Sequence, residues 1–279
     1  MDADYHLVFD RTNWQWGKKN INILMLAVTY KGIAIPVYWL LLNKEGNSNT
    51  RERIALMKRF IAQFGKQHII KVLADREFVG KKWFSWLKSE QIDFAIRIKK
   101  NTQVPNSRGT LVDVQKLFWL LKPGESLVLP KPRKIYDSAV SVYLSALRLE
   151  DGKLLILATA TPCVDAVEIY AQRWQIETLF SCLKGRGFNF EDTHITDRRR
   201  IKRLLVVAVI AFCWAHRAGE WQHEIKPIKV KKHQRLAKSL FREGFDVIND
   251  ALFKLIFTFE NTIKALFCFL AFNQKSEPS

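Results

Sequence analysis

The segment INILMLAVTYKGIAIPVYWLLL, Ile21 to Leu42, decides the fold class. Two apolar runs flank Lys31-Gly32, a pair typical of a hairpin turn between two strands. Both runs are almost continuously apolar, which indicates strands that are covered on both faces. Lys31, Gly32 and Pro36 interrupt the segment, so it does not have the uninterrupted length of a membrane span. We therefore expect a hairpin that lies inside a covered sheet.

The neighbouring residues extend this hairpin into a mixed sheet. YHLVFDRTNW, residues 5–14, is rich in strand-forming residues and precedes the hairpin. Helical and strand-like patterns then alternate, with a helix at 50–64, a strand at 68–75, a helix at 81–91 and a strand at 93–100. Asn49 or Thr50 can cap the first helix, and Gly65 can end it. Three antiparallel strands followed by alternating strands and helices predict a mixed α/β sheet.

The chain changes character after residue 100. Prolines and glycines separate short strand-like runs, so we expect a mostly β insertion at 101–158. Its end, KLLILATAT, can return to the main sheet, and a helix is expected from 165 to 185. We predict a core at 1–100 and 159–220, the insertion at 101–158, and a basic helical C-terminal region at 221–279.

The charge of the chain is unusual. Lys and Arg number 45 against 27 Asp and Glu, a formal net charge of +18. A nucleic acid is the expected neutralising partner, with ribosome association or anionic lipid as alternatives. The four cysteines are far apart, which argues against a zinc site or a disulfide framework and favours a reducing compartment. The N-terminus has no apolar signal-peptide core.

Four polar residues interrupt the apolar helix YAQRWQIETLFSCLKG, residues 170–185. On an ideal helix, Tyr170, Arg173, Glu177 and Lys184 share a stripe about 60° wide beside the apolar face. Tyr, Arg and Lys suit phosphate groups, whereas a glutamate among them suits a cation that itself binds phosphate. The alternative is a helix-stabilising pair between Arg173 and Glu177, four residues apart.

Two aspartates interrupt apolar strands. Asp10 follows Leu7-Val8-Phe9, and Asp75 follows Val72-Leu73-Ala74. Strand interiors disfavour Asp, and a buried carboxylate without a cation is unfavourable. Each aspartate could instead be a strand-end turn residue, but together with Glu177 they could bind Mg²⁺ for phosphodiester cleavage.

These blocks resemble the insertion-sequence-four family of DDE transposases. The spacing of Tyr170, Arg173, Glu177 and Lys184 is similar to the family's Y-R-E-K signature. LVFDRTNW and VLADREFVG resemble its two aspartate blocks, and HEIKPIKVKKHQRLAKSLFR resembles its C-terminal tail. The resemblance implies an RNase H-like mixed sheet flanked by helices, with a mostly β insertion before the helix that carries the glutamate.

The resemblance also implies a function. Asp10, Asp75 and Glu177 would be catalytic ligands of Mg²⁺, with Mn²⁺ as a substitute. Water attack would release a 3′-OH, which would then attack another phosphodiester. The expected partner is double-stranded DNA, both transposon ends and target, bound by a homodimer in the bacterial cytoplasm at the nucleoid, with no membrane contact.

Several residues are candidates for DNA contact. The resemblance implies that Tyr170, Arg173 and Lys184 contact the DNA ends, including a 5′ phosphate. Basic clusters near the C-terminal part predict further phosphate contacts or, alternatively, a solvated surface; their candidate members are Arg198, Arg199, Lys231 and Lys232. Trp174 and Trp119 could stack on an unpaired base, although we expect both to pack in the core. Arg76 and Glu77 could orient Asp75.

The chain departs from the family at its start. Only nine residues precede Asp10, so we expect it to lack the N-terminal region that recognises transposon ends. Two alternatives to a transposase core follow. One is an RNase H-like nuclease without strand transfer, and the other is a truncated, non-catalytic DNA-binding or inhibitory derivative.

Overall fold

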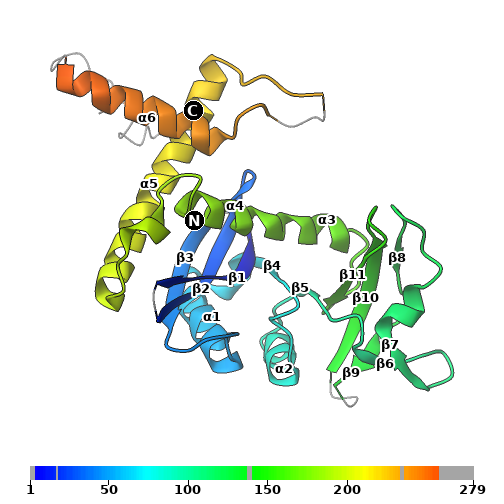
Figure 1. Ribbon diagram of the computed structural model, residues 1–279. Helices are drawn as coiled ribbons and strands as arrows, with labels where there is room; N and C mark the ends of the chain where they lie inside the picture. The colour runs from blue at the N-terminus through cyan, green and yellow to red at the C-terminus, as the bar shows by residue number, and fades with distance from the viewer. Residues whose placement is uncertain (1–3, 17, 137–139, 233–235, 258–279) are drawn as a thin grey trace, which may run out of the picture. The chain divides into compact units, whose positions relative to one another are not determined.

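The computed structural model describes residues 4–16, 18–136, 140–232 and 236–257 of the chain (Figure 1). The chain forms two compact units, Met1–Ser181 and Cys182–Ser279. The division falls inside one helix, α4 (Gln175–Leu183). The domain boundaries expected from composition remain a prediction, and residues 258–279 of the expected C-terminal region lie outside the described residues.

The first unit is built on a mixed sheet of nine described strands, in the order β3-β2-β1-β4-β5-β11-β10-β8, with β9 paired to β10. Strands β1, β2 and β3 are antiparallel neighbours, whereas β4 runs parallel to both β1 and β5. The strands are β1 (Tyr5–Trp16), β2 (Lys19–Tyr30), β3 (Ile33–Leu42), β4 (Ile69–Ala74), β5 (Phe94–Arg97), β8 (Ser126–Val128), β9 (Arg133–Ile135), β10 (Val140–Arg148) and β11 (Leu154–Thr159). The predicted mixed α/β sheet is confirmed.

The hairpin expected at Lys31-Gly32 is present. Both residues have positive φ, 42° and 87°, which suits a tight turn between twisted antiparallel strands. Strand β2 is buried from Ile21 to Val28 without alternation, as expected for a strand covered on both faces.

Helices cover the two faces of this sheet (Figure 1). On one face lie α1 (Thr50–Phe64) and α2 (Lys81–Ser89), and on the other lies α3 (Ala166–Ala171). Helix α1 begins at Asn49, whose side chain accepts a hydrogen bond from the Glu52 amide, and ends at Gly65. This capping box fixes the helix start that the sequence predicted.

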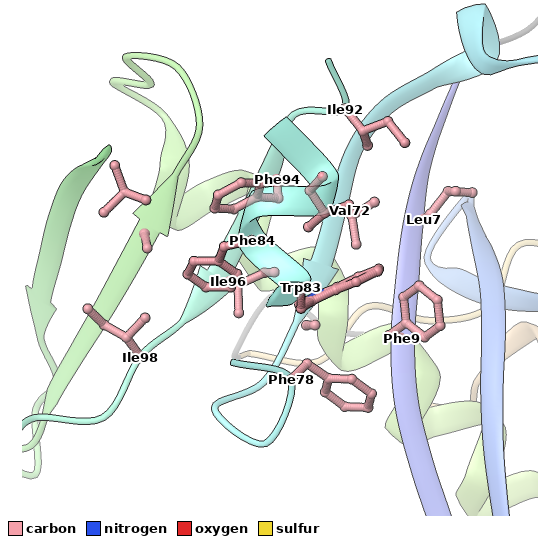
Figure 2. Close-up of a cluster of buried hydrophobic side chains, with 14 of the residues drawn as sticks. Leu7, Phe9, Val72, Phe78, Trp83, Phe84, Ile92, Phe94, Ile96 and Ile98 are labelled. Carbon is pink, nitrogen blue, oxygen red and sulfur yellow. The ribbon is translucent and has the colours of Figure 1, made fainter. Parts of the chain in front are cut away.

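The main core lies between the sheet and the helices α1 and α2. Figure 2 shows Trp83 of α2 pointing toward Phe9 of β1, and their ring centroids are 5.7 Å apart in an edge-on arrangement. Phe84 of the same helix packs against Phe94 of β5 at 4.9 Å. These fully buried rings pack the helix against the strands on either side of β4, the strand that ends directly before Asp75.

Between β5 and α3 the chain forms mainly strands, as predicted for the insertion. A separate two-stranded sheet is formed by β6 (Gln103–Pro105) and β7 (Leu111–Asp113), followed by the 3-10 turn η2 (Val114–Phe118). Strand β11 pairs with β5, so the segment KLLILATAT does return to the main sheet.

The second unit is helical in its described part. It contains the 3-10 turn η4 (Phe190–Thr193) and the helices α5 (Arg198–Ile225) and α6 (Leu240–Phe257). The two helices cross closely at two glycines: a Cβ on Gly244 would lie 1.8 Å from the Ala215 carbonyl oxygen, and one on Gly219 would lie 1.8 Å from that of Leu240. None of the described helices is both long and apolar enough to cross a bilayer.

Candidate active site

The two aspartates are brought together by the parallel pairing of β1 and β4. Phe9 pairs with Ala74, so Asp10 and Asp75 are the next residues along two neighbouring strands. Phe9 and Ala74 face the main core. Because side chains alternate along a strand, both aspartates belong on the opposite face of the sheet, the side on which α3 lies.

The third carboxylate reaches this face from the helical segment after β11. The predicted helix is present but not uniform: α3 ends at Ala171, a 3-10 turn η3 (Gln172–Trp174) follows, and α4 begins at Gln175. Arg173 in the tight turn donates to Asp10 Oδ2 at 3.1 Å and to Glu177 Oε1 at 2.5 Å. One guanidinium thus bridges a strand carboxylate and a helix carboxylate that are far apart in the chain.

Asp10 lies in a mostly buried environment. Burial raises the pKa of Asp10 to about 6, and the hydrogen bond from the Arg11 amide and the charge of Arg173 only partly offset it. The negative charges of Glu77 and Glu177 raise this pKa further. A cation bound beside Asp10 would favour its ionised form and lower this pKa.

Asp75 is less completely partnered than Asp10. Its Oδ1 is buried and accepts no hydrogen bond within the described residues. Arg97, the last residue of β5, places Nη1 3.8 Å from that oxygen, a distance for an ion pair but not for a hydrogen bond. A buried carboxylate oxygen without a hydrogen bond suits the coordination of a cation.

The donor set fits a divalent hard cation. Asp10, Asp75 and Glu177 offer carboxylate oxygens, the ligands that Mg²⁺ prefers, and Asp75 Oδ1 has no hydrogen-bond donor. In the described residues, no three His, Cys, Asp or Glu side chains are already gathered in a geometry for a metal ion. Between two of the three candidate carboxylates lies the Arg173 guanidinium.

The loop that follows Asp75 is held by side-chain contacts that were only partly expected from the sequence. Glu77, predicted to orient Asp75, instead has both carboxylate oxygens 3.4 Å from the Arg11 guanidinium, next to Asp10. Arg11 also donates to Asn22 Oδ1 at 3.0 Å. Arg76, the other residue predicted to orient Asp75, is exposed.

Arg53 of α1 holds the same loop through its backbone carbonyls. It is 3% exposed and donates to the carbonyls of Glu77 at 2.9 Å and Val79 at 3.3 Å, and to the Ser48 hydroxyl and carbonyl. Its guanidinium lies 4.9 Å from the centre of the Phe78 ring. The sequence signal for this role was weak: one arginine on the otherwise apolar face of α1.

The predicted row of polar residues does not lie on one open helix face. Tyr170 and Arg173 are 1% and 5% exposed, whereas the side chain of Glu177 is 54% exposed. The ring of Tyr170 lies 5.7 Å from the Arg173 guanidinium carbon, and burial raises the pKa of the Tyr170 hydroxyl. Lys184 belongs to the second unit, where it pairs with Glu191 at 2.8 Å.

The two tryptophans contradict the packing prediction. Trp174 is 48% exposed and Trp119 is 71% exposed, so neither is a core residue of its unit. Trp174 lies in the short 3-10 turn that buries its neighbour Arg173, and therefore projects the other way. Trp119 follows the turn η2 in the insertion. The structure leaves both rings free to contact a partner.

The predicted basic clusters are on the surface. All four candidate residues of these clusters are exposed in the second unit: Arg198, Arg199, Lys231 and Lys232. Asp197 begins α5 by accepting a hydrogen bond from the Arg200 amide. A shallow hollow at this helix start is lined by Asp197, Arg199, Arg200 and Arg203.

The three candidate carboxylates thus come from within one strand, from directly after its parallel neighbour, and from a later helix of the same mixed α/β unit. The family described as "Transposase DDE domain" matches residues 2–214, which contain all three acidic residues. The chain belongs to this family.

Solved structures with a related outline have little sequence similarity to the chain. A piggyBac transposase synaptic complex with hairpin DNA aligns with a TM-score of 0.49 and 13% identity, covering 93% of this chain. The present chain spans 55% of that piggyBac chain. Human ENDOV aligns with a TM-score of 0.31 and 15% identity, over 74% of this chain and 93% of its own. A Ciona intestinalis endonuclease V bound to inosine-containing DNA aligns with a TM-score of 0.34 and 12% identity. This alignment covers 73% of the present chain and 87% of the endonuclease chain. Among curated proteins, none matches the sequence significantly.

Proposed function

We propose that this chain is a metal-dependent DNA strand-transfer core of the insertion-sequence-four type. Asp10, Asp75 and Glu177 would hold Mg²⁺, or Mn²⁺ in its place. The bound ions would activate the attacking oxygen and stabilise the leaving oxygen at a phosphodiester. The products would be a 3′-OH end and, after transesterification, a joined strand.

One observation carries this proposal. Asp10, within β1, and Asp75, directly after β4, follow the paired residues Phe9 and Ala74 of two parallel strands, and Arg173 links Asp10 to Glu177. Strand-end turns alone would explain each aspartate, but not a helix glutamate tied to one of them. A helix-stabilising pair would explain Arg173 and Glu177, but not the bond from Arg173 to Asp10.

DNA binding is the second part of the proposal. Tyr170, Arg173 and Lys184 would contact the DNA ends, and Trp174 would stack on an unpaired base. The exposed residues Arg198, Arg199, Lys231 and Lys232 would contact phosphates of the transposon end or the target. A homodimer bound to DNA at the bacterial nucleoid, in the cytoplasm, completes the proposed assembly.

A strand-transfer assay with precut ends tests the chemistry. Labelled duplexes that already carry a 3′-OH are incubated with the chain, target DNA and Mg²⁺ or Mn²⁺, and joined products are resolved on a denaturing gel. Asp10→Ala, Asp75→Ala and Glu177→Ala should each abolish joining while DNA affinity, measured by fluorescence anisotropy, changes less than about threefold.

Two exposed carboxylates outside the candidate site serve as controls. Glu168→Ala removes an exposed carboxylate from α3, and Asp151→Ala removes one from an exposed turn; both should join DNA at the wild-type rate. Cleavage without joining would favour an RNase H-like nuclease. DNA binding with neither reaction would favour a non-catalytic derivative. Near wild-type joining by Glu177→Ala would remove Glu177 from the site.

A further inference from the structure

Arg173 holds the position that a cation between two of the proposed ligands would take. Its Nη1 lies 3.1 Å from Asp10 Oδ2 and its Nη2 lies 2.5 Å from Glu177 Oε1. These two carboxylates are two of the three proposed metal ligands. A guanidinium with its two terminal nitrogens on two carboxylates offsets one of their two negative charges, whereas a divalent ion would offset both.

Within the described residues, two buried polar atoms of the candidate site have no hydrogen-bond partner. Arg173 Nε is buried and donates to no acceptor within the described residues. Asp75 Oδ1 is likewise buried and accepts no hydrogen bond there. Buried polar groups are almost always hydrogen-bonded, so a donor and an acceptor that are both unmatched at one site call for an explanation. A site whose full set of partners includes a metal ion and a phosphate would explain both.

The three side chains of this bridge differ in their exposure to solvent. The side chain of Arg173 is 6% exposed and that of Asp10 is 16% exposed, but Glu177 is 54% exposed. Glu177 is therefore reachable from solvent while its arginine partner is enclosed. Solvent therefore screens the contact of Arg173 with Glu177 more than its contact with Asp10.

We propose, on the basis of the function above, that Arg173 is an exchangeable placeholder. In the resting site it bridges Asp10 and Glu177 and partly offsets their charge, and it gives up both carboxylates when they bind a divalent ion. A guanidinium and a divalent cation repel each other strongly at contact distance, so they do not share the same two oxygens. The released guanidinium then binds a DNA phosphate, which makes metal binding and DNA binding mutually reinforcing.

A purely structural salt bridge predicts the opposite effect of a mutation. If Arg173 only organises the site, its loss should weaken metal binding, because the carboxylates lose their positions. If Arg173 competes with the metal ion, its loss should strengthen metal binding. The sign of the change in metal affinity separates the two roles, and it can be measured without DNA and without catalysis.

The first experiment titrates the intact chain with MnCl₂ by calorimetry. Wild type should bind Mn²⁺ at a site that Glu177→Ala loses, and Arg173→Gln should bind it about tenfold more tightly. Arg11→Gln is the matched control, because it removes a positive charge next to Asp10 that contacts Glu77 instead of the ligand pair. It should change the affinity by about twofold or less.

Each outcome of this titration distinguishes an Arg173 that competes with the metal ion from one that only organises the site. Arg173→Gln binding Mn²⁺ no more tightly than wild type would overturn the placeholder role alone. Absence of any Mn²⁺ binding by wild type would overturn the proposed function, and the placeholder with it. If Arg173→Gln does not fold, Arg173→Lys serves in its place, since one ammonium cannot span both carboxylates. It should also bind Mn²⁺ more tightly than wild type, and weaker binding would refute the idea.

The second experiment measures the coupling to DNA. A duplex end with a 5′ phosphate and a 3′-dideoxy terminus, which cannot join, is titrated with and without Mg²⁺. Mg²⁺ should tighten binding by wild type at least fivefold, but by less than twofold for Arg173→Gln. Equal tightening in both proteins would show that the released guanidinium is not the link.

Discussion

Replacing Arg53 with leucine should destabilise the first unit and loosen the loop that follows Asp75. Arg53 makes four hydrogen bonds, two to Ser48 and one each to the carbonyls of Glu77 and Val79. Leucine fills similar space on the buried face of α1 but donates to none of these acceptors. The substitution therefore isolates the polar role of the side chain from its volume.

The expected loss of unfolding free energy is the difference between the lost hydrogen bonds and the avoided cost of burying a charge. Four hydrogen bonds from a charged donor contribute roughly 1–2 kcal/mol each, so about 4–8 kcal/mol is lost. Burial lowers the pKa of Arg53 from 12.5 to about 10, so keeping the charge in the folded chain costs roughly 3 kcal/mol, which leucine avoids. The net loss of unfolding free energy is then about 1–5 kcal/mol. The lower end applies if water reaches the freed carbonyls of Glu77 and Val79, which are only half-buried.

Urea unfolding followed by tryptophan fluorescence measures this loss, with Trp83 as a buried reporter in the adjacent core. Arg51→Leu is the control, because Arg51 is an exposed residue of the same helix. It should change the unfolding free energy by less than about 0.5 kcal/mol. A change in unfolding free energy below about 1 kcal/mol for Arg53→Leu would refute the proposal that Arg53 stabilises the loop after Asp75. Equal losses in both variants would show only a general effect of removing a positive charge.

Three further predictions concern other parts of the molecule. Because the folded pKa of Asp10 is about 6 and thus above its ordinary value of 3.8, ionised Asp10 costs stability above pH 6 and nothing below pH 4. Asp10→Asn should therefore raise the metal-free unfolding free energy by about 2–3 kcal/mol at pH 8. This gain should vanish near pH 4, and a constant gain at both pH values would contradict the assignment. Gly244→Ala should destabilise the α5–α6 pair by about 2–4 kcal/mol in a thermal melt, because its Cβ would overlap the Ala215 carbonyl; an unchanged melt would show that the crossing is looser. Trp119→Ala should leave the melting temperature within about 1 °C, since the ring is exposed, but weaken binding to DNA with an unpaired base roughly tenfold. Equal binding to fully paired and unpaired DNA by wild type would remove Trp119 from DNA contact.

Much of the first unit could be predicted from the sequence, because its signals are local. The turn at Lys31-Gly32 and the cap at Asn49 specify backbone geometry within a few residues. Unbroken apolar runs identify strands that both faces of a sheet must cover, as in β2. The resemblance of the acidic blocks to a transposase family agrees with the family match over residues 2–214.

The candidate site was predictable only as a set of residues, and its geometry was not. The ideal helix geometry placed Tyr170 and Arg173 at the border of the buried face, but the 3-10 turn at 172–174 buries Arg173 and exposes Trp174. Trp119 was expected to pack, yet it is exposed, because hydrophobicity alone does not say whether a ring finds a partner in its own unit.

The sequence by itself determined the strands, the helices and the identity of the acidic residues. Only the tertiary structure decided that Arg173 meets Asp10, 163 residues away, and that Arg53 braces the loop after Asp75. The physical reason is that local patterns set how a segment buries its apolar side chains. Which segments become neighbours depends on the order of strands in the sheet, here β1 beside β4, and that order emerges only when the whole core packs.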